Sequence, residues 1–213
     1  MLILHHGHSE FLLETSDGFC ILTDPFDAHV GYPMKEVSCQ AVTVSHAHGD
    51  HCFVDKAKGD IAIADRSGRT RLAEGIYATG IETAHDDADG AKRGKNLVFI
   101  IECEGLRLAH LGDLGAWDEA LVQQLQDIDL MFIPVGGYYT IDHKSAAALV
   151  RQTRPRIVIP MHYKTEVNAS WPISPLADFL QEMNALNAPV MPLLRVTKED
   201  LSEQPSLIVL ADR

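Results

Sequence analysis

Residues 41–52, AVTVSHAHGDHC, join an apolar run to a dense group of polar side chains. The β-branched residues of the run favour an extended strand, and Gly49 allows a sharp turn beyond its end. Four candidate metal ligands lie around this turn: His46, His48, Asp50 and His51. The two histidines on one side of the extended chain can share a metal, and the pair beyond the turn can reach a second one. The alternative is a polar loop whose histidines face solvent, but this spacing is far more demanding than a lone histidine.

The motif V-S-H-A-H-G-D-H resembles the H-x-H-x-D-H signature of the metallo-β-lactamase superfamily. Other segments resemble the branch that contains the ascorbate-6-phosphate lactonases and related hydrolases. These segments are His8-Ser9 with Phe11, Thr23-Asp24-Pro25-Phe26, His85-Asp86-Asp87 with Gly90, and Gly112-Asp113-Leu114-Gly115. The resemblance spans nearly the whole chain. It implies an α/β fold, namely a four-layer αβ/βα sandwich of two mixed sheets with helices outside.

The resemblance also implies a site for two divalent metal ions. The implied ligands are His46, His48 and His85 for one metal, Asp50, His51 and His162 for the other, and Asp113 as the bridge. Asp50 and Asp113 would be the catalytic carboxylates. Zinc is the first expectation, with manganese, iron or nickel as alternatives, because histidine and aspartate ligands serve all of them. A bridging aspartate in place of a thiolate ligand argues against a true zinc β-lactamase.

The remaining pattern predicts strands that end at these ligands. Extended segments are expected at residues 2–4, 11–15, 20–23, 61–64, 76–83, 97–103, 106–111, 130–135, 157–160, 190–196 and 207–210. Helices are expected at residues 54–58, 118–126, 143–153 and 175–186, with Asp118 and Asp142 as N-caps. Asp17-Gly18 and Glu104-Gly105 predict two-residue hairpin turns.

The run before His162 mirrors the run before His46, which suggests two related halves that face each other across a cleft.

Further side chains are candidates for holding a ligand or contacting substrate: His8, Asp24, Arg93, Asn96, Tyr139, His143 and Lys164. Gly90, Gly94 and mixed charge predict that residues 86–96, which contain Arg93 and Asn96, form a loop. Asp24 could hold a ligand histidine by its other ring nitrogen, or form an Asx turn ahead of Pro25. His8 could approach the metals or merely fix the backbone. Arg93 and Lys164 could bind an anionic group, although exposed cations are common.

Two residues near these motifs have plainer expectations. His29, in the loop at residues 26–34, is expected to be exposed to solvent. Cys52 follows the metal motif directly and could be an accessory ligand, but a small packed residue is the more usual role of a lone cysteine.

Size and charge limit the function further. The chain has 213 residues, of which 46% are hydrophobic and 23% charged, so one domain spanning residues 1–213 is expected. A formal net charge of −12 disfavours nucleic acid as a partner. No signal peptide or membrane span is expected, and four widely spaced cysteines fit a reducing cytoplasm. The sequence does not determine the oligomeric state, and a homo-oligomer is one option.

These observations predict a hydrolase in which a water shared by two metals attacks a lactone, ester or phosphoester. The substrate would be a small molecule, with an anionic group as an option. Two alternatives from the same superfamily are an iron-dependent oxidoreductase and a nuclease. The acidic charge and the lack of room for a nucleic-acid-clamping insertion weigh against the nuclease.

Overall fold

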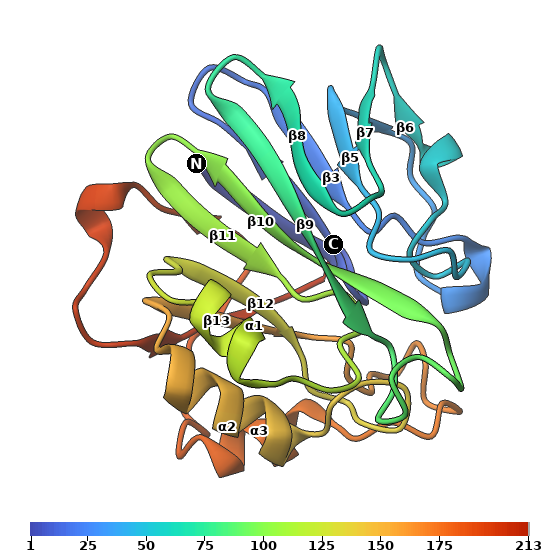
Figure 1. Cartoon of the computed structure of the whole chain (residues 1–213), viewed down its shortest axis with the longest axis vertical. Coiled ribbons are helices and arrows are strands. Elements are labelled where there is room, and N and C mark those ends of the chain that lie inside the picture. The colour runs from blue at the N-terminus through green and yellow to red at the C-terminus, as the bar shows by residue number, and fades with distance from the viewer. Residues whose placement is uncertain (213) are drawn as a thin grey trace.

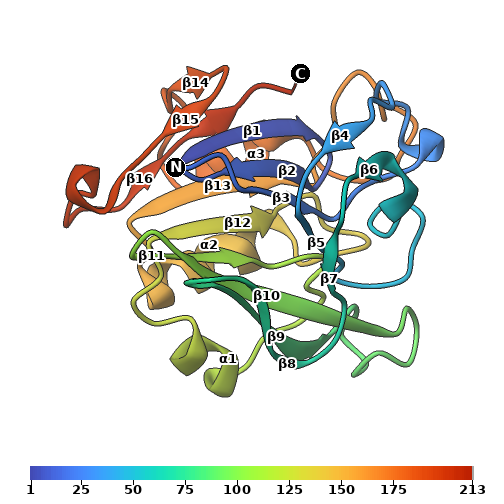
Figure 2. The same cartoon turned by 90° about the horizontal axis from the view of Figure 1, so that it is seen from above.

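Two mixed β-sheets face each other at the centre of the molecule, and Figures 1 and 2 show them from two directions. The structure is a computed structural model that describes residues 1–212, so Arg213 of the expected domain lies outside the described residues. The six-stranded sheet has the order β15 (Leu194–Arg195), β1 (Leu2–Gly7), β2 (Glu10–Glu14), β3 (Cys20–Thr23), β5 (Ala41–Thr43), β7 (Ala62–Ala64). The seven-stranded sheet has the order β16 (Ser206–Leu207), β13 (Ile157–Met161), β12 (Leu130–Pro134), β11 (Leu106–His110), β10 (Lys95–Cys103), β9 (Ile76–Ala84), β8 (Gly68–Ala73).

The main core lies between the two sheets, because alternate residues of each strand point to opposite faces. Phe11 and Leu13 of β2 point into this core, where they join Phe99 and Ile101 of β10. The intervening Ile100, together with Val98, points to the other face of the seven-stranded sheet and packs against the helices instead. The predicted two-sheet sandwich is therefore confirmed, with both faces of the seven-stranded sheet buried.

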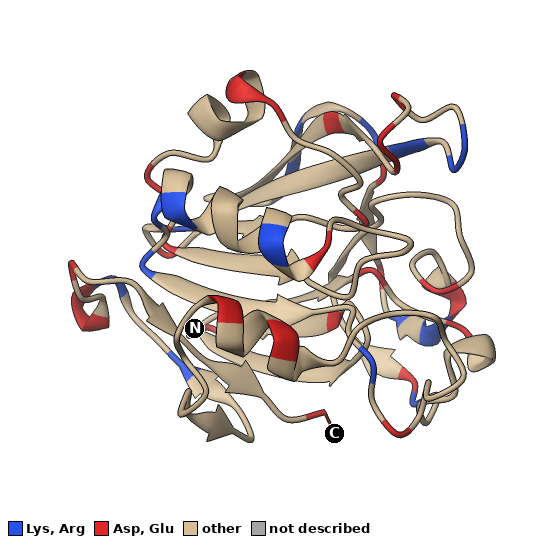
Figure 3. Ribbon diagram, turned by 90° about the horizontal axis from the view of Figure 1, so that it is seen from below, with Lys and Arg blue, Asp and Glu red and all other residues tan. Residues whose placement is uncertain are grey.

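The α-helices cover the outer face of the seven-stranded sheet (Figure 1). They are α1 (Glu119–Gln124), α2 (His143–Thr153) and α3 (Leu176–Glu182). Asp118 and Asp142 cap α1 and α2 by accepting the backbone N–H of Leu121 and Ser145, as predicted. The basic positions of α2 and the acidic ones of α3 stand out in Figure 3, and Arg151 pairs with Glu182 at 3.1 Å.

The outer face of the six-stranded sheet has a different cover. A short parallel pair, β4 (Val37–Ser38) and β6 (Ala57–Lys58), lies there together with the 3₁₀ helix η2 (Val54–Lys56). The side chains of Val37 and Ala57 close an apolar cluster with Leu22 and Val42. Residues 54–58, expected to be helical, are thus a 3₁₀ turn followed by a strand.

Several boundaries differ from the predicted ones. The first hairpin was predicted to have the two-residue turn Asp17-Gly18. Its loop instead has three residues, 16–18, because Thr15 N–H donates to Phe19 O and Gly18 takes the left-handed conformation at φ +85°. The Glu104-Gly105 turn joins Cys103 to Leu106 directly and is the predicted two-residue turn. Strand β8 was not expected, since its alternating arginines resemble a solvated run.

The C-terminal segments are more broken than the pattern predicts. Helix α3 is shorter than residues 175–186, and the expected closing strands are divided into β14 (Val190–Met191), β15, β16 and β17 (Val209–Leu210). Two further 3₁₀ turns are η1 (Ala28–Val30) and η3 (Lys198–Asp200). Among residues 1–212, none of the helices is both long and apolar enough to cross a membrane.

Strand direction places the functional residues. In the six-stranded sheet β1, β3 and β5 run parallel to one another, so their carboxyl ends share one edge. In the seven-stranded sheet β9, β11, β12 and β13 also share a direction. Loops beyond the carboxyl ends of strands are the usual place for a site in such sheets. The candidate ligands all follow these strand ends.

Candidate metal centre

The predicted ligands converge from both sheets. Three groups of side chains bring their donor atoms within 4.8 Å of one another: His46, His48 and His85; His8, Asp50, His51 and His162; and His46, His51 and Asp113. The first two groups divide the histidines as the two-metal prediction requires. His8, for which the sequence left two roles open, lies in the second group. Its ring is 4.3 Å from that of His162, centre to centre.

Asp113 lies between the two groups. Its Oδ2 atom is 3.3 Å from Nε2 of His85 and 3.3 Å from Nε2 of His162, and 3.9 Å from Nε2 of His46. Its Oδ1 atom is 3.2 Å from Nε2 of His51. One carboxylate therefore faces histidines of both groups, which is the position expected of a bridging ligand.

Strained backbone turns three of these side chains toward the site. His8, Asp24 and His162 each directly follow a strand, and each has a positive φ, of 56°, 42° and 53°. This conformation costs a residue other than glycine about 1–3 kcal/mol and persists only where the surroundings impose it. Such outliers concentrate at functional sites, so the strain supports a functional role for these strand ends.

Asp24 holds two of the candidate ligands in place. Its buried carboxylate accepts a hydrogen bond from Nδ1 of His51 at 2.8 Å and from the Ser45 backbone N–H at 2.8 Å. It also accepts from the Ser45 hydroxyl at 2.6 Å, and that hydroxyl lies 2.9 Å from Nδ1 of His46. Both histidines thus present Nε2 to the site. Asp24 thus contacts Nδ1 of His51, the ring nitrogen that faces away from the site. This is the contact expected if Asp24 holds a ligand histidine by its other ring nitrogen.

We expect Asp24→Ala to weaken metal binding by about 10- to 100-fold, because a histidine ligand that loses its carboxylate partner is less basic and less well oriented. Metal affinity should be measured by competition with a coloured chelator, and circular dichroism should report the fold. Asp24→Asn, which can still accept a hydrogen bond, should show a smaller loss. Altered folding with normal metal affinity would instead favour the turn role.

Burial and neighbouring charges shift the pKa values of the cluster. Burial lowers the pKa of His46 to about 3 and that of His8 to about 4, and nearby histidines add to the effect. Burial opposes charge on His51 too, yet Asp113 and Asp24 raise its pKa well above 6.5. Burial acts to raise the pKa of Asp113, but His162 and His51 hold it well below its usual range. The lowered pKa values of His46, His8 and Asp113 favour the protonation states that metal binding needs, whereas His51 would have to release a proton to bind a metal.

Unsatisfied polar atoms show that a metal fits this donor set. Within residues 1–212, buried atoms without a hydrogen-bond partner include Nε2 of His46, His51 and His162, both ring nitrogens of His8, and Oδ1 of Asp113. Each such atom costs about 1–3 kcal/mol when it has no partner. Several in one place are hard to explain as packing, and they are the atoms that would coordinate metal ions.

Two glycines let the Asp113 loop lie close to its neighbours. A Cβ atom at Gly112 would collide with the side chains of Asn96 and Ser45, and one at Gly115 would collide with the backbone of Asp86. Asn96 belongs to β10 and is buried, so its expected position in the loop at residues 86–96 is wrong. Its Oδ1 accepts the backbone N–H of Asp113 at 2.9 Å, and its Nδ2 donates to Leu111 O. Asn96 therefore positions the Asp113 loop and does not line the cavity described below.

A cavity of about 320 Å³ opens onto these residues. The side chains around it are His29, His48, Asp50, His85, Arg93, Asp113, Tyr139 and Trp171. Arg93 and Tyr139 were predicted as substrate contacts, and the structure brings both to the cavity. His29 is exposed as expected but also lines the cavity, and Trp171, whose ring lies 5.4 Å from that of His8, was not expected. Neither residue occurs in a motif that could have revealed it.

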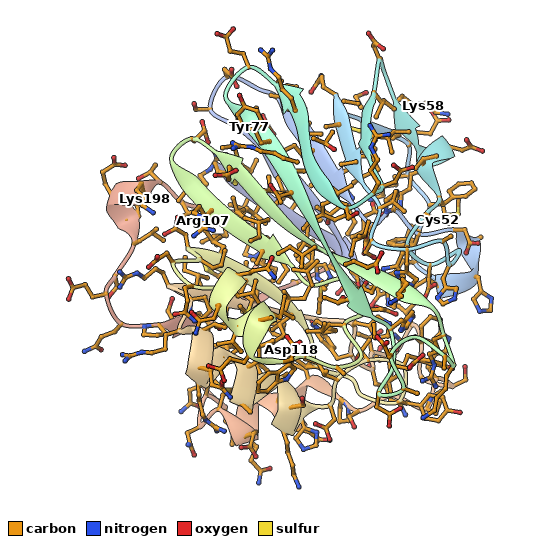
Figure 4. The ribbon with its side chains drawn as sticks, in the orientation of Figure 1. Cys52, Lys58, Tyr77, Arg107, Asp118 and Lys198 are labelled. Atoms are coloured by element: carbon orange, nitrogen blue, oxygen red, sulfur yellow. The ribbon has the colours of Figure 1, made fainter. Side chains whose placement is uncertain are left out.

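Other candidates lie elsewhere among the described residues. His143 begins α2 and Lys164 pairs with Pro175 in an isolated bridge, and neither lines the cavity. Cys52, labelled in Figure 4, is half-buried against the apolar cluster of the six-stranded sheet and belongs to none of the ligand groups. His110 packs behind the site, because its Nε2 donates to the backbone carbonyl of Ser9 at 2.9 Å and its Nδ1 lies 3.9 Å from Oδ2 of Asp24.

Known proteins resemble this chain over most of its length. The family model of the beta-lactamase superfamily domain matches residues 2–162. A UPF0173 metal-dependent hydrolase of Thermococcus kodakarensis is 31% identical over 214 residues, which cover 84% of this chain and 89% of that protein. The narrower likeness to the ascorbate-6-phosphate lactonases stays a prediction.

Solved structures agree in fold. A Thermotoga maritima protein assigned to the Zn-dependent hydrolases of the metallo-β-lactamase superfamily aligns with a TM-score of 0.81 at 33% identity, over 100% of this chain and 99% of that one. An isothiocyanate hydrolase from Delia radicum gut bacteria aligns with a TM-score of 0.65 at 12% identity and shares the fold. The chain belongs to the metallo-β-lactamase superfamily and, within it, to the UPF0173 metal-dependent hydrolases.

Proposed function

We propose that this protein hydrolyses a small lactone, ester or phosphoester at a site that binds two divalent metal ions. The observation that carries the proposal is the position of Asp113, whose Oδ2 lies 3.3 Å from a histidine of each ligand group. Two metals about 3.5–4 Å apart would lower the pKa of a shared water toward neutrality and polarise the bond that it attacks.

The chain's own residues prepare the attack. Asp24 accepts a hydrogen bond from Nδ1 of His51, so Nε2 of His51 is directed inward toward Asp113. Asp50 lines the cavity and is partly exposed, so its carboxylate can accept a hydrogen bond from the attacking water. Among the described residues around the cavity there is no serine or cysteine, which supports water as the nucleophile. Tyr139 and Trp171 form an apolar wall that limits the entry of further solvent.

Zinc is our first choice of metal, because imidazole-rich sites with open positions are typical of catalytic zinc. The Thermotoga maritima protein described as Zn-dependent supports this choice. Manganese, iron and nickel remain alternatives with the same ligands. A small molecule is the expected substrate, since the net charge of −12 opposes the approach of nucleic acids.

Removing the metals should abolish hydrolysis. We expect dialysis against a strong chelator to remove activity towards a panel of lactones, carboxylic esters and phosphoesters, and about two equivalents of Zn²⁺ per chain to restore it. Elemental analysis of the untreated protein identifies the native metal. Turnover that survives complete demetallation would refute the proposal. Iron in the native protein, together with substrate-dependent oxygen consumption, would favour the oxidoreductase instead.

A further inference from the structure

Arg93 occupies the boundary between two adjoining cavities. It lines the cavity of about 320 Å³ that contains the candidate ligands, and it also lines a neighbouring cavity of about 520 Å³. Tyr139 is the other residue that the two cavities share. The second cavity, here called the outer cavity, is bounded mainly by the loop after His85 and by the segment that leads into α2: Asp86, Asp87, Lys92, Arg93, Gly115, Tyr138, Tyr139, Thr140, Ile141, Asp142 and Ser145.

The backbone that carries Arg93 is fixed. The carboxylate of Asp86 accepts four backbone N–H groups, from Ala88, Gly90, Lys92 and Arg93, at 2.7–3.0 Å. The loop is thus folded around the Asp86 side chain, next to the candidate ligand His85. A loop held in this way keeps the Arg93 side chain at the cavity without a large entropic cost on binding.

Arg93 differs from the neighbouring cations in its partners. Lys92 pairs with Asp87 at 2.6 Å, and Lys95 lies 3.5 Å from Glu82. No carboxylate among the described residues pairs with Arg93. Its guanidinium instead lies beside two aromatic rings, 5.7 Å from the centre of Tyr138 and 5.5 Å from that of Tyr139. Cation–π contacts hold the group in place and leave its N–H donors free.

The acidic groups of the outer cavity already have partners. Asp86 is occupied by the four N–H groups, Asp87 by Lys92, and Asp142 by the Ser145 N–H that it caps. Of the two cations that line the outer cavity, Lys92 and Arg93, only Arg93 has no carboxylate partner among the described residues. A guanidinium with free donors matches the planar oxygens of carboxylate or phosphate.

We propose that Arg93 binds an anionic group of the substrate, a carboxylate or a phosphate, at the boundary between the metal-lined cavity and the outer cavity. This inference rests on the proposed hydrolase function and adds the substrate class. The scissile bond lies over the candidate ligands, and the anionic group of the same molecule lies against the Arg93 guanidinium, where the two cavities meet beside Tyr139. The outer cavity accepts whatever part of the molecule extends beyond that group.

Matched substrates test this assignment. A neutral lactone or ester should be compared with two derivatives that carry a carboxylate or a phosphate away from the reacting bond. For Arg93→Gln we expect kcat/KM for the anionic substrates to fall by about 10- to 100-fold, mainly through KM, with less than about a threefold change for the neutral one. Arg93→Lys should recover part of the loss. Lys95→Gln removes a neighbouring charge that lines neither cavity, and it should leave the turnover of all three substrates unchanged. The derivative, carboxylate or phosphate, whose kcat/KM falls further in Arg93→Gln carries the anion that Arg93 binds.

A binding measurement separates this inference from the proposed function. Calorimetric titration of the zinc-loaded protein with succinate, methylphosphonate and neutral succinamide requires no turnover. Weaker binding of an anion to Arg93→Gln, with Lys95→Gln unchanged, supports the anion site even if none of the esters is hydrolysed. Equal anion affinities in Arg93→Gln and the unaltered protein would overturn it. A parallel loss of turnover on neutral and anionic substrates would also overturn it, because Arg93 would then only support the loop.

Discussion

Asp113→Asn should keep the fold and lower kcat by roughly 1000-fold, the scale expected when a charged group that organises the reacting centre is lost. An amide matches the carboxylate in shape but is neutral and offers one oxygen in place of two. In the carboxylate, Oδ2 faces His85 and His162, one histidine from each ligand group. The single neutral oxygen of an amide could not bind the metals of both groups as well. Steady-state kinetics with a responsive ester, combined with metal analysis, measures the effect.

Asp118→Asn is the matched control for this change. Asp118, labelled in Figure 4 at the start of α1, undergoes the same chemical change on the same stretch of chain but contacts only the helix N-terminus. Asparagine is also a good N-cap, so stability and turnover should be unaffected. If Asp113→Asn retained normal turnover and metal content, Asp113 would not be the bridge.

His162→Ala should lower the metal content from about two to about one ion per chain and cause a large loss of rate. His162 comes from β13 of the seven-stranded sheet, whereas Asp50 and His51 of the same group follow β5 of the other sheet. Without it the group made by His46, His48 and His85 is intact. Metal content of the purified variant, together with cobalt absorption spectra, shows which group has emptied.

His143→Ala serves as the control, because His143 lies at the start of α2 and lines neither cavity. It should retain both metals. A His162→Ala variant that also bound two metals and turned over normally would show that His162 only packs at a strand end. His8, which is in the same group, would then be the next ligand to replace.

The sequence predicts the ligand set well because each ligand follows a short apolar strand. The runs before His46 and His162 indicate strand ends without knowledge of the partners of those strands. Within each sheet the parallel strands bring their ligand-bearing ends to one edge, and the donor groups from the two sheets meet in the folded structure. Asp24 could be proposed for the same reason, since it directly follows β3.

The cavity wall could not be predicted in this way. His29 and Trp171 reach it from loops far apart in the sequence, and their positions depend on tertiary packing. Asn96 was placed in a loop because a polar, glycine-containing run precedes it, yet hydrogen bonds to β9 and to the Asp113 loop draw it into β10. Strand β8 was missed because the pairing of its backbone with β9 outweighs its polar side chains.

The division of the ligands between the two sheets has a consequence for stability. Each proposed metal takes ligands from both layers: His46 and His48 with His85 in one case, and Asp50 and His51 with His162 in the other. Metal ions bound in this way act as cross-links that oppose separation of the layers. An ion present at about 100 times its dissociation constant adds about 2.7 kcal/mol to the free energy of unfolding. The supply of metal would therefore set the lifetime of the folded protein as well as its rate of turnover.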